Sequence, residues 1–288
     1  SIMFIKDIEK NKDTVLSFEI FPPKPDTPFE SVTEAARKLA LKKPDFISVT
    51  YGAGGSSRDN TFALASFIQD ELNVTSLAHL TCVGTAKETL GDILSELSER
   101  KIQNILALRG DFPPGQDDMC LDFKHASDLI SEIKKFDDFC VGGACYPEGH
   151  TESDNIVTDI ENLKYKTAAG VDFLVSQLYF DNDVFYNFLY RAAARGIEVP
   201  VHAGIMPVVN RNSVKRMCRL SGATLTPKYR NMLDKYYDKP ESLRKAGIVY
   251  ASEQIIDLVA NGVSGIHIYT MNKPDIAEEI MYNLKGII

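Results

Sequence analysis

The chain has 288 residues, a net charge of -8, 44% hydrophobic residues and 25% charged residues, an ordinary composition for a globular protein. An acidic chain lacks the basic face that a broad nucleic-acid surface needs, so we expect no nucleic-acid partner. No apolar run is long enough to span a bilayer and the first residues lack the apolar core of a signal peptide, so we expect neither a membrane span nor export.

The cysteine and histidine patterns argue against disulfides and metal sites. Five cysteines, an odd number without a C-x-x-C pair, predict reduced thiols in a cytoplasmic protein. The five histidines form neither H-x-H nor H-E-x-x-H, so we expect no bound metal.

Strand-like and helix-like segments alternate along the chain. Eight short apolar segments, rich in β-branched and aromatic residues, predict strands at 15–21, 46–51, 76–82, 105–109, 139–146, 173–179, 199–206 and 265–270. Helical periodicity appears at 86–100, 155–168, 183–194 and 252–260. Thr85 and Glu88 are spaced as a capping box for the first of these helices, and Gly170 and Gly196 stand where helices are expected to end.

This alternation predicts an α/β protein with a parallel sheet, either a (β/α)8 TIM barrel or a doubly wound open sheet. We expect a single domain over residues 1–288. The segment 222–244 is longer and more polar than a crossover helix needs, which predicts a helical excursion before the last strand.

The polar residues favour the barrel because they share one face of nearly every strand. That face carries Ser17, Glu19, Ser48, Thr50, His79, Thr81, Arg109, Asp111, Gln177, His202, His267 and Tyr269. The alternate positions predict a helix-facing set of Phe18, Ile47, Val49, Leu80, Leu108, Leu174, Ile205, Ile266 and Ile268. Polar groups at the carboxyl ends of barrel strands are where such folds place their active sites.

The fourth strand is the most informative, because the apolar run 105–108 ends on Arg109-Gly110-Asp111 and a Pro-Pro-Gly turn. Two opposite charges at the end of a buried strand are costly unless a ligand or a partner uses them. Alternation places Arg109 and Asp111 on one face with Ala107. Asp111 either tunes a ligand electrostatically or caps the turn.

Glu19 is the first candidate for acid–base chemistry. It lies near the end of the first strand among apolar neighbours, which can raise the pKa of a carboxyl group toward the value that a general acid needs. The alternative is a structural ion pair, for instance with Arg109. The glycine-rich loop 52–58 lacks the third glycine of a Rossmann motif and instead predicts a backbone that passes close to a ligand.

An ordered set of motifs resembles the catalytic domain of the bacterial-type 5,10-methylenetetrahydrofolate reductase family. The motifs are Ser17-Phe-Glu-Ile-Phe-Pro-Pro23, Ser48-Val-Thr-Tyr-Gly52, Ala78-His-Leu-Thr81, Leu106-Ala-Leu-Arg-Gly-Asp111, Ala144-Cys-Tyr-Pro-Glu-Gly-His150, Gln177, Gly204-Ile-Met-Pro207 and Tyr269-Thr-Met-Asn272.

The resemblance implies a flavoprotein oxidoreductase of one-carbon metabolism and methionine biosynthesis. FAD would bind at the carboxyl ends of the strands and accept electrons from NADH or NADPH, with NADH favoured. Methylenetetrahydrofolate would then be reduced to 5-methyltetrahydrofolate in a ping-pong sequence. The resemblance also implies a homo-oligomer and, for some members, a partner subunit. No regulation by S-adenosylmethionine is expected.

The resemblance also assigns site residues. Glu19 would be the general acid, and Asp111 would act near the flavin and the pterin. Gln177, Met217 and Lys273 would contact substrate, although the family often has phenylalanine and arginine at the last two positions. The FAD contacts would be Thr50, His79, Leu108, Arg109, Gly110, Asp111, His125, Ala126, Ala144, Tyr146, His150, Asp159 and Lys166.

Two alternatives remain. One is a different barrel enzyme without flavin, such as a pterin-binding transferase or an aldolase. The other is a flavin-binding subunit that takes electrons from a partner protein and not directly from NAD(P)H.

Overall fold

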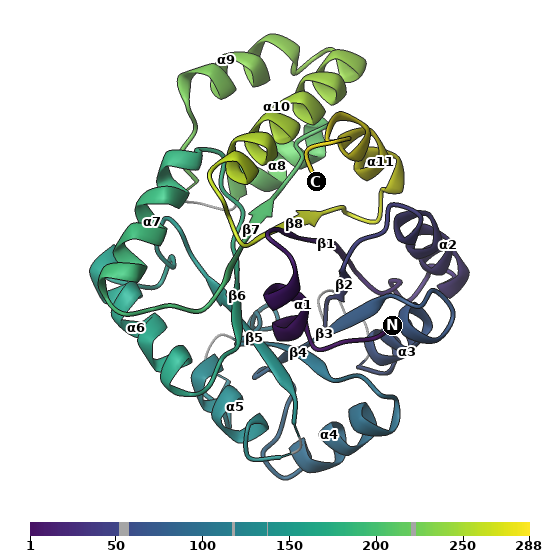
Figure 1. Ribbon diagram of the computed structural model, residues 1–288, viewed down its shortest axis with the longest axis vertical. Helices are drawn as coiled ribbons and strands as arrows, with labels where there is room; N and C mark the ends of the chain where they lie inside the picture. The colour runs from purple at the N-terminus through teal and green to yellow at the C-terminus, as the bar shows by residue number, and fades with distance from the viewer. Residues whose placement is uncertain (52–57, 117–118, 137, 220–222) are drawn as a thin grey trace.

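A computed structural model describes residues 1–51, 58–116, 119–136, 138–219 and 223–288. Eight parallel strands form a closed barrel in which each strand pairs with the next and the last pairs with the first (Figure 1). The strands are β1 (Val15–Ile20), β2 (Phe46–Val49), β3 (Thr75–Thr81), β4 (Asn104–Leu108), β5 (Cys140–Cys145), β6 (Phe173–Ser176), β7 (Val201–Ile205) and β8 (Gly265–Tyr269). The TIM-barrel prediction is confirmed, and the open sheet is excluded.

Helices surround the barrel, as Figure 1 shows. They are α1 (Ile5–Asn11), α2 (Phe29–Ala40), α3 (Arg58–Asp70), α4 (Leu90–Glu99), α5 (Ala126–Ile133), α6 (Ile156–Ala168), α7 (Asn182–Ala194), α8 (Arg211–Arg219), α9 (Pro227–Tyr236), α10 (Pro240–Ala260) and α11 (Pro274–Asn283). The predicted excursion before the last strand is present as α9 and the first part of α10.

Helix boundaries follow local signals in most places. The Asn155 side chain caps α6 by accepting a hydrogen bond from the Thr158 N–H, and Gly170 and Gly196 adopt positive φ just after their helices. The capping box at Thr85 is wrong. The Thr85 N–H donates to the Cys82 carbonyl, which holds Thr85 in the turn after β3, so α4 begins only at Leu90.

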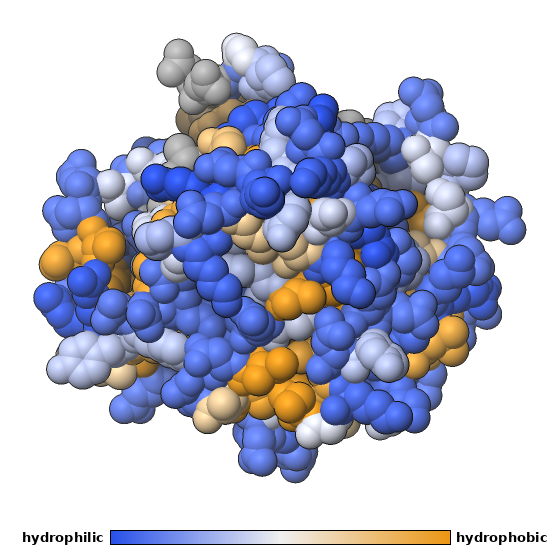
Figure 2. All heavy atoms as spheres, turned by 90° about the horizontal axis from the view of Figure 1, so that it is seen from above, coloured by the Kyte–Doolittle hydropathy of each residue, from blue (hydrophilic) through white to orange (hydrophobic). Residues whose placement is uncertain are grey.

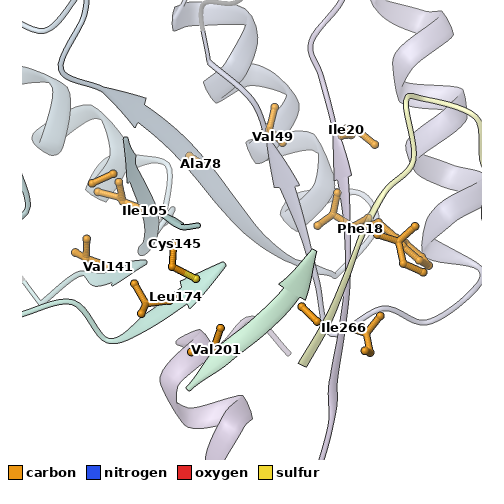
Figure 3. Packing of buried hydrophobic residues seen from close by; sticks show 14 of the residues in the cluster. Phe18, Ile20, Val49, Ala78, Ile105, Val141, Cys145, Leu174, Val201 and Ile266 are labelled. Atoms are coloured by element: carbon orange, nitrogen blue, oxygen red, sulfur yellow. The ribbon is translucent and has the colours of Figure 1, made fainter. Parts of the chain in front are cut away.

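The main hydrophobic core lies between the barrel and its helices. Alternate strand residues such as Phe18, Val49 and Leu174 point outward into it (Figure 3). Of the predicted helix-facing set, Leu108 alone is placed wrongly. Leu106 and Leu108 instead face the barrel interior, and Ala107 packs against the helices. The fourth strand is apolar on both faces, so alternation could not decide which face was inside.

The amino end of the barrel is closed by α1. Ile5 and Ile8 pack with the interior residues Val15 and Phe46 in a separate buried cluster. The Ile5 N–H donates to Asn104 Oδ1 at 2.9 Å, at the first residue of β4. Only the carboxyl end of the barrel is thereby left for a ligand.

The face of the molecule that Figure 2 shows is largely hydrophilic. Seen from above, apolar residues form only small separate patches (Figure 2). In the described part of the chain, no helix combines the length and the apolar character that crossing a membrane requires.

Candidate active site

Two adjoining cavities of about 590 and 770 Å³ open at the carboxyl ends of the strands. They share Leu108, Arg109, Ala144, Tyr146 and His150 and therefore form one continuous site. The first cavity lies over the barrel interior, and the second extends outward between the ends of β4 and β5 and helices α5 and α6.

Glu19 lies in the first cavity beside two histidines. Its Oε2 is 3.5 Å from His267 Nε2 and 3.9 Å from His79 Nε2. Ser17 Oγ is 2.7 Å from His267 Nδ1 and orients that ring from the opposite side. Strand alternation places Ser17 and Glu19 on the interior face, and closure of the barrel brings β8 alongside them.

The surroundings of Glu19 act on its pKa in opposite directions. Burial raises it, but the hydrogen bond from His267 and the electrostatic interactions with the nearby His79, His267 and Arg216 side chains outweigh burial, so the pKa lies below its ordinary value. The expected raised pKa is therefore wrong. The suggested pairing with Arg109 is also wrong, because Arg109 binds Glu152.

His79 is buried and uncharged at neutral pH. Burial lowers its pKa to about 4, although the Glu19 carboxylate opposes this shift and His267 adds to it. Between this value and the ordinary pKa of 6.5, the unfolded chain binds a proton at His79 that the folded chain does not.

We therefore expect acidification to weaken the fold through His79. Lowering the pH from 7 to 5 should reduce the free energy of unfolding by about 2 kcal/mol more in the wild type than in His79→Asn. Urea unfolding at a series of pH values measures this, with His125→Asn, a substitution of an exposed histidine, as the control. An equal pH dependence in the wild type and His79→Asn would contradict the assignment.

The end of β4 is built around Gly110, which has φ of +83°. A Cβ there would lie 2.8 Å from Thr81 Cβ, so no larger residue fits without movement. On one side of Gly110, Arg109 forms a bidentate ion pair with Glu152. On the other side, Asp111 is exposed at the rim of the first cavity.

The second cavity is lined by a half-buried lysine and an aromatic pair. Lys166 Nζ donates to the Ala144 carbonyl at 2.7 Å and lies 5.6 Å from the centre of the Tyr146 ring. Burial lowers the pKa of Lys166, although nearby Cys145, Asp159 and Cys82 oppose the shift. The Tyr146 and His150 rings meet edge to face, with centroids 4.6 Å apart.

Most of the predicted site residues line these cavities. The first contains Glu19, Thr50, His79, Leu108, Arg109, Gly110, Asp111, Ala144, Tyr146, His150 and Gln177, and the second adds His125, Ala126, Asp159 and Lys166. The roles of these residues toward a ligand stay predictions.

Two predicted substrate residues lie outside both cavities. Met217 is buried in the cluster around α8 and α9, with Val214 and Tyr229. Lys273 is exposed at the start of α11. Of the loop expected to pass close to a ligand, 52–58, residues 52–57 lie outside the described residues, and Arg58 lines the first cavity.

Several cavity residues were not predicted from the sequence, notably Arg216 in the first cavity and Glu152 in the second. For Arg216 a signal existed. Helical spacing puts Val214 and Met217 on the buried face of α8 and leaves Arg216 at its flank. Nothing local marks Glu152, because its partner lies 43 residues earlier. In the described part of the chain, no group of three or more histidine, cysteine or acidic side chains is arranged to hold a metal ion.

Comparison with known proteins decides the family. The sequence pattern of the family described as methylenetetrahydrofolate reductase matches residues 4–285. The chain belongs to this family. The 5,10-methylenetetrahydrofolate reductases of Pectobacterium carotovorum and Escherichia coli K12 are 33% and 32% identical to it; each alignment covers 93% of this chain, and 89% and 90% of those proteins respectively. The predicted family is confirmed.

Other relatives of this reductase-family chain are longer. Methylenetetrahydrofolate reductase (NADH) 1 of Arabidopsis thaliana is 35% identical over 99% of this chain, which spans about half (50%) of its length. Among solved structures, a Clostridium thermocellum protein described as binding two copies of 5-methyl-5,6,7,8-tetrahydrofolic acid superposes with a TM-score of 0.71. That alignment covers 99% of both chains at 14% identity, and the likeness supports the barrel fold alone.

Proposed function

We propose that this protein is an FAD-dependent enzyme that reduces 5,10-methylenetetrahydrofolate to 5-methyltetrahydrofolate with electrons from NAD(P)H. The observation that carries the proposal is the continuous two-cavity site, in a chain of this family, with Glu19 in the first cavity and Arg109 and Lys166 along the second. The product would supply methyl groups for methionine biosynthesis.

The residues present fit FAD. A flavin dinucleotide needs a wide compartment for its ring and an adjoining one for its adenosine, and the two cavities share a wall of five residues. Lys166 and Arg109 offer cationic donors for its diphosphate and hydroxyl groups, and Gly110 and Ala144 leave the backbone open to close approach. Bound there, FAD would supply the hydride relay between NAD(P)H and the folate.

Glu19 is suited to hold the proton that opening of the folate ring consumes. In the ligand-free site its pKa is lowered, so the proton must be taken up with the substrate. A pterin that enters the first cavity displaces water from Glu19, and the added desolvation raises its pKa. Gln177 lies in the same cavity and offers an amide for pterin or nicotinamide groups.

The single first cavity supports a ping-pong sequence. Nicotinamide and folate would each exchange hydride with the same flavin ring, and both would reach that ring through the first cavity, of about 590 Å³. The two substrates would therefore occupy it in turn. NADH is the favoured donor, because the Arabidopsis relative carries NADH in its name.

Asp111→Asn should slow hydride transfer to the folate by about tenfold and slow flavin reduction by NADH much less. The Asp111 carboxylate at the rim stabilises positive charge that develops on the folate, and a neutral amide does not. Stopped-flow absorbance of the two half-reactions measures both rates. Equal slowing of both would indicate a purely structural role for Asp111.

The visible spectrum of the purified protein tests the function. A yellow protein that bleaches under anaerobic NADH and regains its colour with methylenetetrahydrofolate would support both half-reactions. A yellow protein that responds to neither NADH nor NADPH would favour the subunit that takes electrons from a partner protein. A protein that stays colourless after FAD is added would contradict the proposal and favour a flavin-free barrel enzyme.

A further inference from the structure

Arg109 stands at the junction of the two cavities, and its donors are already engaged. Its Nη2 donates to Glu152 Oε1 at 3.0 Å, and its Nη1 donates to Glu152 Oε2. Its Nε points to the Gly110 carbonyl at 3.4 Å, and the guanidinium lies over the Phe112 ring. A bidentate carboxylate occupies one whole edge of a guanidinium, the same edge that a phosphate group would use.

Glu152 is the more exposed partner of this pair. Its side chain is 59% exposed and that of Arg109 is 30% exposed. Its main chain is tied to the loop by a hydrogen bond from the Glu152 N–H to His150 Nδ1. Among the described residues its carboxylate has no other hydrogen-bond donor, so it can turn outward into solvent while Arg109 stays in place.

We propose that Glu152 is a resident counter-anion of the flavin site, which pairs with Arg109 in the flavin-free protein and competes with the FAD diphosphate for that guanidinium. This inference rests on the proposed FAD-dependent function. Before FAD binds, the Glu152 carboxylate occupies the position beside Arg109 that a phosphate group would take. It thereby holds the Arg109 guanidinium in place between the two cavities.

The proposed competition between Glu152 and the FAD diphosphate predicts the direction in which a substitution of Glu152 changes the affinity for FAD. When FAD binds, Glu152 either leaves Arg109 or remains beside two negatively charged phosphates, and both outcomes weaken binding. Removing the charge should therefore tighten it. Since exposed ion pairs are modest in strength, we expect the FAD dissociation constant to fall about three- to tenfold.

The test compares Glu152→Gln and Glu152→Ala with Asp154→Asn. Asp154 lies on the same loop, is exposed, and makes no hydrogen bond or ion pair with the described residues, so its substitution controls for net charge. The purified, flavin-loaded full-length chain is diluted, and the recovery of free FAD fluorescence gives the dissociation constant. Thermal unfolding of each variant verifies that it is folded.

Tighter FAD binding in both Glu152 variants, with Asp154→Asn unchanged, is the expected result. Glu152→Gln keeps an oxygen that can accept from Arg109, so unchanged binding in this variant with weaker binding in Glu152→Ala would mean that Glu152 only positions Arg109, and would overturn the inference. Equal tightening in Asp154→Asn would overturn it as well. A wild type that binds no FAD would instead contradict the proposed function.

Discussion

Glu19→Gln should lower the rate of hydride transfer to methylenetetrahydrofolate by about 10²- to 10⁴-fold, the range that a positioned general acid contributes. Glutamine keeps the size of the side chain but cannot release a proton to the leaving nitrogen of the folate ring. The Ser17 bond that orients His267 does not depend on Glu19, so the cavity should keep its shape. FAD content and flavin reduction by NADH should therefore stay close to wild type.

Anaerobic stopped-flow absorbance separates the two half-reactions of this variant. Glu99→Gln is the matched control, because Glu99 is exposed at the end of α4 and makes no hydrogen bond or ion pair with the described residues. A Glu19→Gln protein that reoxidises with the folate at the wild-type rate would rule out the acid assignment. Loss of FAD would show that Glu19 supports the site structurally.

Gly247→Ala should destabilise the protein by about 3 kcal/mol or more, because it introduces an atom where there is no space. Gly247 lies inside α10 at the point where this helix crosses the chain that leaves β7. A Cβ there would overlap the Val208 carbonyl oxygen and lie 2.7 Å from its carbon. Val208 is two residues from Met206, which lines the first cavity.

A second glycine in a helix provides the control. Gly91 lies in the first turn of α4, and an added Cβ would meet only the Phe136 ring, at 3.6 Å. Gly91→Ala should therefore leave stability unchanged or raise it by about 0.5 kcal/mol, through the lower entropy of the unfolded chain. Urea unfolding of the two variants compares them directly. Similar small effects in both would mean that α10 is not held against Val208.

For the two interior histidines, the sequence pattern predicted the strand face but not the contacts of the rings. Alternation along β3 and β8 was enough to place His79 and His267 on the same face of their strands as Glu19 on β1. It could not show that both rings approach one carboxylate oxygen. That contact depends on the pairing of β1 with β8, and it reverses the direction of the pKa shift expected for Glu19.

The sequence by itself determined the eight strands, the barrel, the family and many of the polar residues of the cavities, because strand composition, side-chain alternation and ordered motifs are local properties. Only the tertiary structure decided that Leu108 faces inward, that Met217 lies on the buried face of α8, and that Arg109 pairs with Glu152 instead of Glu19. The physical reason is barrel closure and helix packing. Barrel closure and helix packing determine which of two apolar strand faces points inward, and they bring together side chains from distant segments. The burial and the charges around each group follow from that arrangement.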